Sequence, residues 1–294
     1  MMPDQNRNHV EATNSEIDAL ADTKPRTPLS KAVTKALQDG NTRLWAAQRT
    51  DVGSVRERNE DSCLLFCSEA GGHFPLLPFG LYVVADGMGG HDAGHRASKV
   101  GSRTAAHHVL QKIYLPLLEQ ETIPDPDLVD SIIHDAVQIA HEAVYDPDPT
   151  HNGGTTLTLA LILGQELYVA HVGDSRAYCL NDGNLQTVTN DHSLVQRLQD
   201  EGQLTAEEAE QYEYRNVLLR ALGQEDDLEV DTYHRPLPQQ GKLLLCTDGL
   251  CGLVKNPELE RIMNLPISPQ ETTDQLVNAA PQAGVFDNIT AVVV

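Results

Sequence analysis

The sequence has few positive charges and lacks a run of basic residues. Its 294 residues include 21 Lys and Arg against 43 Asp and Glu, which gives a formal net charge of −22 at pH 7. Proteins that bind nucleic acid or anionic membranes need clustered Lys and Arg to neutralise phosphate groups. The composition therefore argues against both classes, and we expect no nucleic-acid and no membrane partner.

Paired cysteines and long apolar runs are also missing. The five cysteines form no CxxC pair of the kind that holds zinc, and each lies in or near an apolar run, which favours buried free thiols. No stretch reaches the roughly 18 apolar residues of a membrane span, and the first residues show acidic side chains in place of an apolar signal segment. We expect a reduced, cytoplasmic location.

Residues 1–43 are predicted to form a disordered N-terminal tail. The segment is polar, has few large apolar side chains and contains Pro25 and Pro28, so burial cannot offset the entropy of ordering it. Order is expected from Leu44, with an edge strand at 45–50. With 40% hydrophobic residues the remainder can bury a sizeable core. We expect one catalytic domain over 44–294, as a monomer.

Alternating apolar patterns predict further strands at 62–67, 81–85, 155–163, 166–172, 176–180, 185–188, 242–246 and 289–294. Helical spacing predicts helices at 93–112, 126–144, 193–201, 206–222 with a possible break, and 269–280. Tight turns at Gly164-Gln165 and around Asp182-Gly183 can join only antiparallel neighbours. The order indicates an α+β fold in which antiparallel sheets pack face to face with helices outside.

Four acidic patches follow or border these apolar runs, so we expect them at strand ends. They are Glu60-Asp61, Asp86-Gly87, Asp248-Gly249 and Asp287-Asn288. Carboxylates from several strand ends can converge, and Mg²⁺ and Mn²⁺ prefer such oxygen ligands. Arg56 lies four residues before Glu60 and is a candidate phosphate clamp. Taken singly, Glu60-Asp61 fits solvated surface acids better than a metal site, and Asp287-Asn288 fits a turn better.

The order of the acidic patches and of a central glycine-rich block along the chain resembles that of the metal-dependent type 2C Ser/Thr protein phosphatases, the PPM family. The resemblance is to the bacterial members of this family. The resemblance covers about residues 45–294 and rests on seven motifs: Arg56 with 59–62, 84–90, Gly154-Thr155-Thr156, 172–176, Asp191-His192-Ser193, 247–250 and 287–290. It implies a four-layer α-β-β-α sandwich, with two central antiparallel sheets flanked by helix pairs. It also implies a hydrolase acting on phosphoserine and phosphothreonine proteins in signal transduction, opposing a cognate Ser/Thr kinase.

The resemblance further implies a centre of two divalent cations, Mn²⁺ or Mg²⁺, and a hydroxide between them that attacks phosphorus. Arg56 would bind the substrate phosphate, and Asp86 would bridge the ions. The implied metal ligands are Glu60, Asp61 through water, Asp86, the Gly87 carbonyl, Asp248 and Asp287. Asp174 and Arg176 are expected to be structural.

Two departures from the family pattern affect this expectation. Met88 stands where many eukaryotic members have a His proposed as general acid, so leaving-group protonation must come from elsewhere. Bacterial members share this Met. His151 stands where bacterial relatives have an Asp that helps bind a third metal, a site that Asp248 would share. Because imidazole is a poorer Mg²⁺ ligand than carboxylate, that third site is expected to be weakened, served by Asp148, or tolerant of a softer metal such as Mn²⁺.

Residues 191–223 match the family's helical insertion beside the active site and are called the flap below. Arg197, Arg215 and Arg220 within it are candidate phosphopeptide contacts, and a solvated helix face explains them equally well. Two rival functions stay open. The first is a catalytically weak or silent family member that binds metal or phosphoprotein as a regulator. The second, a Ca²⁺-binding module, lacks a contiguous acidic loop.

Overall fold

The structure is a computed structural model that describes residues 43–68, 77–89, 92–120, 123–145, 153–224, 227–238, 240–282 and 287–294. The predicted tail, apart from Arg43, lies outside the described residues, as do Asp148 and His151.

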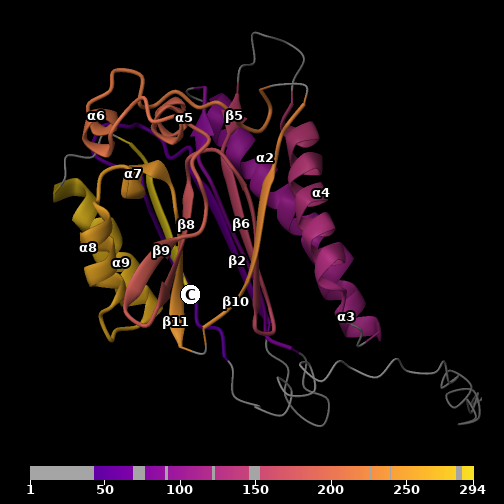
Figure 1. The fold of residues 1–294 in the computed structure, drawn as a ribbon. Helices are drawn as coiled ribbons and strands as arrows, with labels where there is room; N and C mark the ends of the chain where they lie inside the picture. Colours follow the sequence, from indigo (N-terminus) through magenta and orange to yellow (C-terminus); the bar gives the residue numbers. More distant parts are fainter. Residues whose placement is uncertain are drawn as a thin grey trace, which may run out of the picture.

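Two five-stranded sheets, antiparallel throughout, form the centre of the fold (Figure 1). The first has the order β1 (Ala47–Asp51), β12 (Ile289–Val293), β11 (Gly241–Cys246), β8 (Arg176–Asn181) and β9 (Asn184–Thr187). The second has the order β10 (Asp231–Pro236), β7 (Glu166–Val172), β6 (Leu157–Leu163), β3 (Phe79–Ala85) and β2 (Ser62–Ser68). Two short strands, β4 (Gly87–Met88) and β5 (Gly154–Thr155), pair with each other beside them.

Helices cover the outer face of each sheet, which completes the predicted four-layer sandwich (Figure 1). Against the β10–β2 sheet pack α2 (Asp92–Val109) and α4 (Pro126–Val144), and a π-helical turn (Leu110–Tyr114) leads from α2 into α3 (Leu115–Gln120). Against the β1–β9 sheet lie α7 (Asp248–Cys251), α8 (Asn256–Met263) and α9 (Pro269–Gln282). The flap carries α5 (Leu194–Asp200) and α6 (Ala206–Glu210).

Strand β3 shows why the sheets bury both faces. Phe79, Leu81 and Val83 pack into the apolar cluster under α2 and α4, whereas the alternate Tyr82 and Val84 pack into the cluster between the sheets. Side chains of a strand alternate between its faces, so one apolar run supplies both layers. The third cluster lies between the β1–β9 sheet and α8 and α9.

The hairpin that joins β8 to β9 confirms the turn signal. Asp182 and Gly183 have φ of +49° and +81°, the combination that a two-residue hairpin turn requires and that Asp-Gly readily adopts. Most predicted strands and helices are confirmed within a few residues, including the edge strand β1.

Some boundaries were wrong. The helix predicted for 206–222 ends at Glu210, because the backbone beyond it pairs elsewhere: Leu218 bridges Ser193 and Leu222 bridges Thr155. The strand predicted for 155–163 is interrupted at Thr156. Strand β10 and helix α8 were not predicted.

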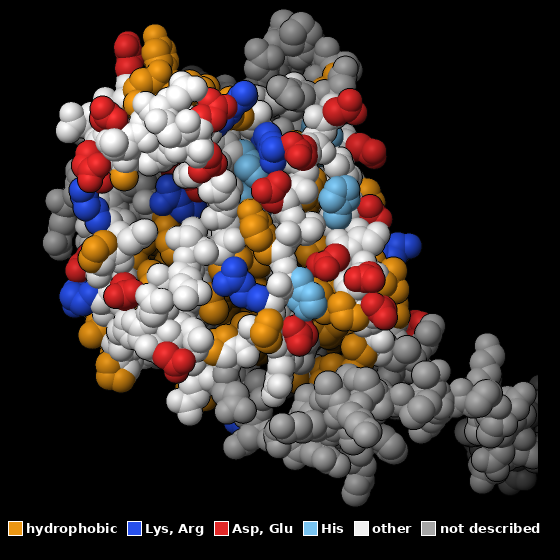
Figure 2. All heavy atoms as spheres, in the orientation of Figure 1, with side chains coloured by type: hydrophobic (Ala, Val, Ile, Leu, Met, Phe, Trp, Pro, Cys, Tyr) orange, Lys and Arg blue, Asp and Glu red, His pale blue; other side chains and the backbone are white. Residues whose placement is uncertain are grey.

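No helix in the described part of the chain combines the length and apolar character that crossing a bilayer needs. Figure 2 shows acidic side chains spread over the viewed face, with Lys and Arg among them.

Candidate active site

Asp86 is held by its backbone at the point where β3 ends. Its N–H donates to Thr156 Oγ1 at 2.9 Å, and its carbonyl accepts from Thr156 N–H at 2.9 Å and from Thr155 Oγ1 at 2.9 Å. Thr156 Oγ1 also lies 2.7 Å from Ser175 Oγ. Hydrogen bonds to its backbone are thus sufficient to fix the position of Asp86, independently of its side chain. This arrangement explains the break between β5 and β6, since Thr156 turns its polar groups to Asp86.

Glu60 approaches the same point from the loop before β2. A Cβ on Gly87 would lie 2.3 Å from Gly94 O and 2.6 Å from Glu60 O, and a Cβ on Gly94 would lie 2.6 Å from Glu60 Oε2. Only glycine permits such an approach at either position. Ser98 Oγ on α2 donates to Glu60 O at 2.5 Å. The loop, the glycine turn and the start of α2 therefore pack closely around Glu60.

Asn288 ties this loop to the C-terminal strand. Its side chain is buried; Oδ1 accepts from Glu60 N–H at 2.8 Å, and Nδ2 donates to Val52 O at 2.9 Å and to Arg58 O at 3.0 Å. The same residue's N–H donates to Asp287 Oδ1 at 2.9 Å. One amide thus fixes the acidic patches at 60 and 287, which are far apart in sequence, relative to each other.

Asp61 is buried between the two sheets' ends. Its Oδ2 accepts from Thr247 Oγ1 at 2.9 Å and Thr290 Oγ1 at 2.6 Å, while its Oδ1 is buried without a hydrogen-bond partner among the described residues. Burial raises the pKa of Asp61 to about 7, against the lowering effect of the two hydroxyls, and Asp248 and Asp287 raise it further.

Asp86 and Asp248 belong to the same electrostatic group. Burial, followed by repulsion from Asp61, Asp248 and Asp174, raises the pKa of Asp86 well above its ordinary value. The pKa of Asp248 is raised too, by burial first, although a hydrogen bond shared with Asp86 works in the opposite direction. Asp248 Oδ1 is a second buried oxygen without a partner within the described residues. These carboxyls repel one another in a poorly solvated space.

Arg56 stands at the open side of this group. Its guanidinium donates to Asp287 Oδ2 at 2.8 Å, and the two side chains are 47% and 38% exposed. The hydrogen bond to Asp287 raises the pKa of Arg56, and the charges of Glu60 and Asp86 act in the same direction. A solvent-accessible guanidinium next to buried carboxyls can receive an anion from solution.

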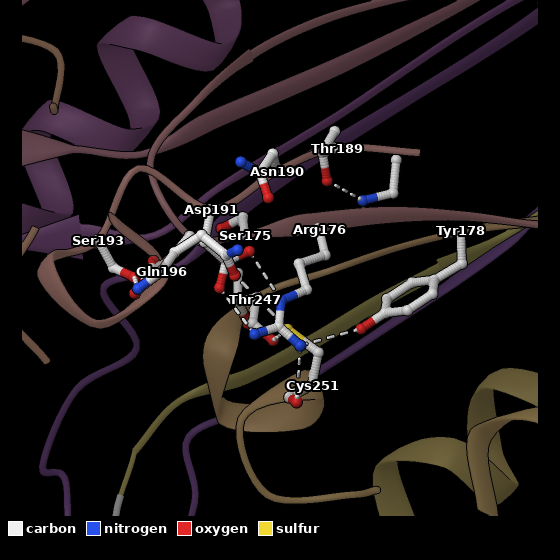
Figure 3. A network of polar contacts seen from close by, with 12 residues as sticks. Ser175, Arg176, Tyr178, Thr189, Asn190, Asp191, Ser193, Gln196, Thr247 and Cys251 are labelled. Carbon is white, nitrogen blue, oxygen red and sulfur yellow. Dashed lines mark hydrogen bonds and ion pairs between the residues drawn. The ribbon is translucent and has the colours of Figure 1, made fainter. Parts of the chain in front are cut away.

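A second arginine, Arg176 at the start of β8, joins the flap to the helix that begins with Asp248 (Figure 3). Its Nε and a terminal nitrogen donate to the two carboxylate oxygens of Asp191 at 2.8 and 2.7 Å. Its other terminal nitrogen donates to Tyr178 Oη at 3.3 Å and Cys251 O at 3.4 Å. The first residue of the flap is thereby tied to α7.

Comparison with known proteins identifies the family. The family model described as protein phosphatase 2C matches residues 54–280. The chain belongs to the protein phosphatase 2C family. It is 35% identical over 255 residues to the serine/threonine phosphatase stp of Listeria welshimeri, covering 85% of this chain and 95% of that protein. It is 35% identical over 254 residues to the serine/threonine protein phosphatase PstP of Mycobacterium tuberculosis, covering 85% of this chain and 44% of that longer protein.

Solved structures agree. A crystal structure of the Mycobacterium tuberculosis phosphatase PstP superposes with a TM-score of 0.68 at 34% identity, covering 84% of this chain and 96% of that one. A structure of the PstP catalytic domain in complex with two manganese ions gives a TM-score of 0.66 at 34% identity, with the same coverage.

The family's ions can be tested against the residues present. Buried carboxyls that repel one another and two unpartnered carboxylate oxygens form a hard-oxygen donor set, and a divalent cation there would relieve both conditions. The residues therefore fit. Metal ligation by them stays a prediction, because within the described ranges no three His, Cys, Asp or Glu side chains form a group arranged to hold an ion as they stand.

Most of the predicted site residues meet at one end of the sandwich. Hydrogen bonds, close contacts or electrostatic interactions link Arg56, Glu60, Asp61, Asp86, Gly87, Asp248 and Asp287. His151 is outside the described residues, so its predicted part in a third metal site stays a prediction. Asp174 was expected to be structural, which stays a prediction, and it lies close enough to Asp86 and Asp248 to interact with them electrostatically.

No role was predicted for the side chains that hold the acids in place, which are Thr156, Ser175, Thr247, Asn288 and Thr290. Four of them lie within or next to an acidic motif, whereas Thr156 lies in the glycine-rich block 70 residues from Asp86. Hydroxyl and amide side chains at such positions are common in sequences, and their partners become visible only in three dimensions.

The three flap arginines are engaged within the protein. Arg197 pairs with Glu201 at 3.0 Å, and Arg215 donates to Glu210 O at 2.8 Å. Arg220 donates to Asp231 at 3.0 Å. These contacts favour the structural interpretation of the three side chains over the phosphopeptide interpretation.

Replacing Asn288 with Ala should destabilise the fold and the site together. The change leaves the Glu60 N–H and two carbonyls without their partner. An unsatisfied buried group costs about 1–3 kcal/mol, which applies in full to the Glu60 N–H. The two carbonyls belong to the exposed residues Val52 and Arg58 and can be partly hydrated, so we expect a total loss of about 2–4 kcal/mol in the free energy of unfolding. Urea unfolding measures it. Asn264→Ala, which removes an exposed amide hydrogen-bonded to two carbonyls, is the control. Equal losses of stability in both variants would contradict the special structural role of the buried Asn288 amide.

Asp86→Asn should stabilise the metal-free protein. A carboxyl whose pKa is raised in the folded state favours folding while protonated, and this stability is lost as pH rises through the folded pKa. Asparagine keeps its amide neutral throughout. In EDTA we expect the variant to exceed the parent by about 1 kcal/mol near neutral pH, roughly 2–4 °C in Tm, with a gap that widens from pH 5 to pH 8. Exposed Asp135→Asn is the control. A lower Tm for Asp86→Asn at pH 8 would refute the repulsion argument.

Proposed function

We propose that this protein is a metal-dependent protein serine/threonine phosphatase that hydrolyses phosphoserine and phosphothreonine in proteins. The observation that carries the proposal is the group of buried, mutually repelling carboxyls at Asp61, Asp86 and Asp248, with the exposed guanidinium of Arg56 at its open side. Membership of the protein phosphatase 2C family and the names of the relatives support the same activity.

The ions are proposed to be two Mn²⁺ or Mg²⁺, as in the PstP complex with two manganese ions. Glu60, Asp61, Asp86, the Gly87 carbonyl, Asp248 and Asp287 would hold them, and a weak third ion would use Asp248 and His151. When bound, such ions polarise phosphoryl oxygens and make hydroxide available near neutral pH.

The protein's own residues supply position and charge. The backbone of Asp86, fixed by Thr155 and Thr156, sets where its carboxylate projects. The hydroxyls of Thr247 and Thr290 favour the ionised form of Asp61. Arg56 would exchange its contact with Asp287 for two phosphate oxygens, which its planar fork fits. Met88 cannot donate a proton, so the leaving serine or threonine oxygen takes its proton from water or from another group.

The wider setting belongs to the same proposal. We place the protein in the cytoplasm, acting as a monomer in signal transduction on proteins phosphorylated by a Ser/Thr kinase. Residues 44–294 form the catalytic domain, the flap inserts at about 191–223, and residues 1–43 precede the domain as a tail.

A phosphatase assay tests the activity. With Mn²⁺ the protein should release phosphate from a phosphothreonine peptide and from p-nitrophenyl phosphate, and EDTA should abolish both. Asp248→Asn should lower kcat by at least about a hundredfold, because the charge of one ligand is lost. Absence of metal-dependent turnover in a protein that still binds Mn²⁺ by calorimetry would favour the silent regulator.

Arg56 can be tested apart from the metals. Arg56→Ala should lower kcat/KM for the phosphopeptide by about 10- to 100-fold, since a charge-assisted contact with phosphate is lost. Mn²⁺ affinity should stay close to that of the parent. Arg58→Ala is the matched control, because Arg58 is an exposed neighbour that pairs with Asp92. A similar loss in both variants would show that Arg56 has no specific contact with the phosphate.

A further inference from the structure

A basic hollow lies beside the proposed active site, between α2 and the edge strand β2. It has a volume of about 330 Å³ and is lined by Ser62, Cys63, Leu64, His95, Lys99, Ser102 and Arg103. This space, together with the residues that line it, is called the basic hollow below. Among the described residues that line it, none is an Asp or Glu, in a protein whose formal net charge is −22. The hollow is thus a local exception to the charge of the molecule.

Helical spacing creates this exception. His95, Lys99 and Arg103 are four residues apart, so they share one face of α2. All three are exposed, and within the described part of the chain Lys99 and Arg103 have no ion pair. Ser62 Oγ and Ser102 Oγ lie 3.1 Å apart in the same lining. Two free cations with hydroxyls between the elements are suited to a phosphate dianion.

The basic hollow adjoins the acidic site directly. His95 Nδ1 lies 3.1 Å from Asn59 O, and Ser98 on the same helix bonds to Glu60 O. Ser62 follows Asp61 in sequence and begins β2. Because β2 is the last strand of its sheet, its outer edge offers a place for an extended peptide.

We propose that the basic hollow is an accessory subsite for a second phosphoryl group of the substrate, so that the enzyme prefers doubly phosphorylated segments. Lys99 and Arg103 bind that group, and the half-buried Ser62 hydroxyl turns from Ser102 to donate to one of its oxygens; Ser102 is buried and its hydroxyl donates to Lys99 O. An extended chain advances about 3.3–3.6 Å per residue, so the number of residues between the two phosphoryl groups has to match the separation of the two sites. This inference rests on the proposed phosphatase function.

The test uses peptides with one phosphothreonine and, two to six residues away, a non-hydrolysable phosphonate, an alanine or a glutamate. For the parent protein with Mn²⁺, we expect kcat/KM to be about tenfold higher for the best phosphonate peptide than for the alanine peptide, the gain expected from two exposed ion pairs together. Lys99→Ala/Arg103→Ala should remove this gain and leave turnover of the alanine peptide and of p-nitrophenyl phosphate unchanged. Lys112→Ala/Lys255→Ala removes the same charge from residues that do not line the hollow and should keep the gain.

Three outcomes would overturn the subsite: no gain for the phosphonate at any spacing, an equal gain in both double variants, or a glutamate peptide as good as the phosphonate peptide. The last would show that the surface responds to acidic charge alone. Binding of the same peptides, followed by fluorescence anisotropy, gives the second readout. If no peptide is hydrolysed, the phosphatase function fails, and the subsite is still judged by whether tighter phosphonate binding depends on Lys99 and Arg103.

Discussion

Repulsion among buried carboxyls is the constraint around which this end of the molecule is organised. Asp61, Asp86 and Asp248 lie where solvation is poor. Burial raises the pKa of all three carboxyls, and the charges of neighbouring acids raise each pKa further. A fold does not gain stability from such an arrangement unless cations or protons compensate it. The surrounding hydrogen bonds are accordingly directed at backbone and at single carboxylate oxygens, and Oδ1 of Asp61 and of Asp248 stay unpartnered within the described chain. The acids are held in place by the fold even though they repel one another.

The rigidity comes from contacts that are remote in sequence. Asn288 connects the loop at 52–60 with the last strand, Thr247 and Thr290 join two strand ends through Asp61, and Thr156 fixes the end of β3. Because these bonds cross both sheets, the position of each acid depends on the packing of the whole sandwich. The flap is connected in the same way, through Arg176 and Asp191. Its position is therefore mechanically linked to α7, which starts at Asp248.

The acids themselves could be predicted from sequence because strand ends can be recognised: apolar runs stop at Ala85 and Cys246, and an acid follows within two residues. Strands β3 and β11 belong to different sheets, and the face-to-face packing of the two sheets brings these ends together. The secondary-structure predictions that were wrong concern segments whose conformation depends on tertiary contacts. Helical spacing continues past Glu210, but Leu218 and Leu222 pair as strand bridges, which local spacing does not encode. Strand β10 was missed because its alternation runs through polar side chains such as Asp231 and His234.

The net charge illustrates a second limit of sequence patterns. The basic residues of the hollow are not consecutive in sequence, since three residues separate His95 from Lys99 and Lys99 from Arg103. Only the helix places them on one face. An overall charge of −22 repels phosphoproteins at long range, so affinity for them must arise from short-range contacts where screening by salt is least effective. Arg56 by itself provides a single short-range contact of this kind. The cations of the basic hollow between α2 and β2 would provide further contacts close to Arg56. The protein could then distinguish substrates by the spacing of their phosphates, while its acidic surface disfavours other anions.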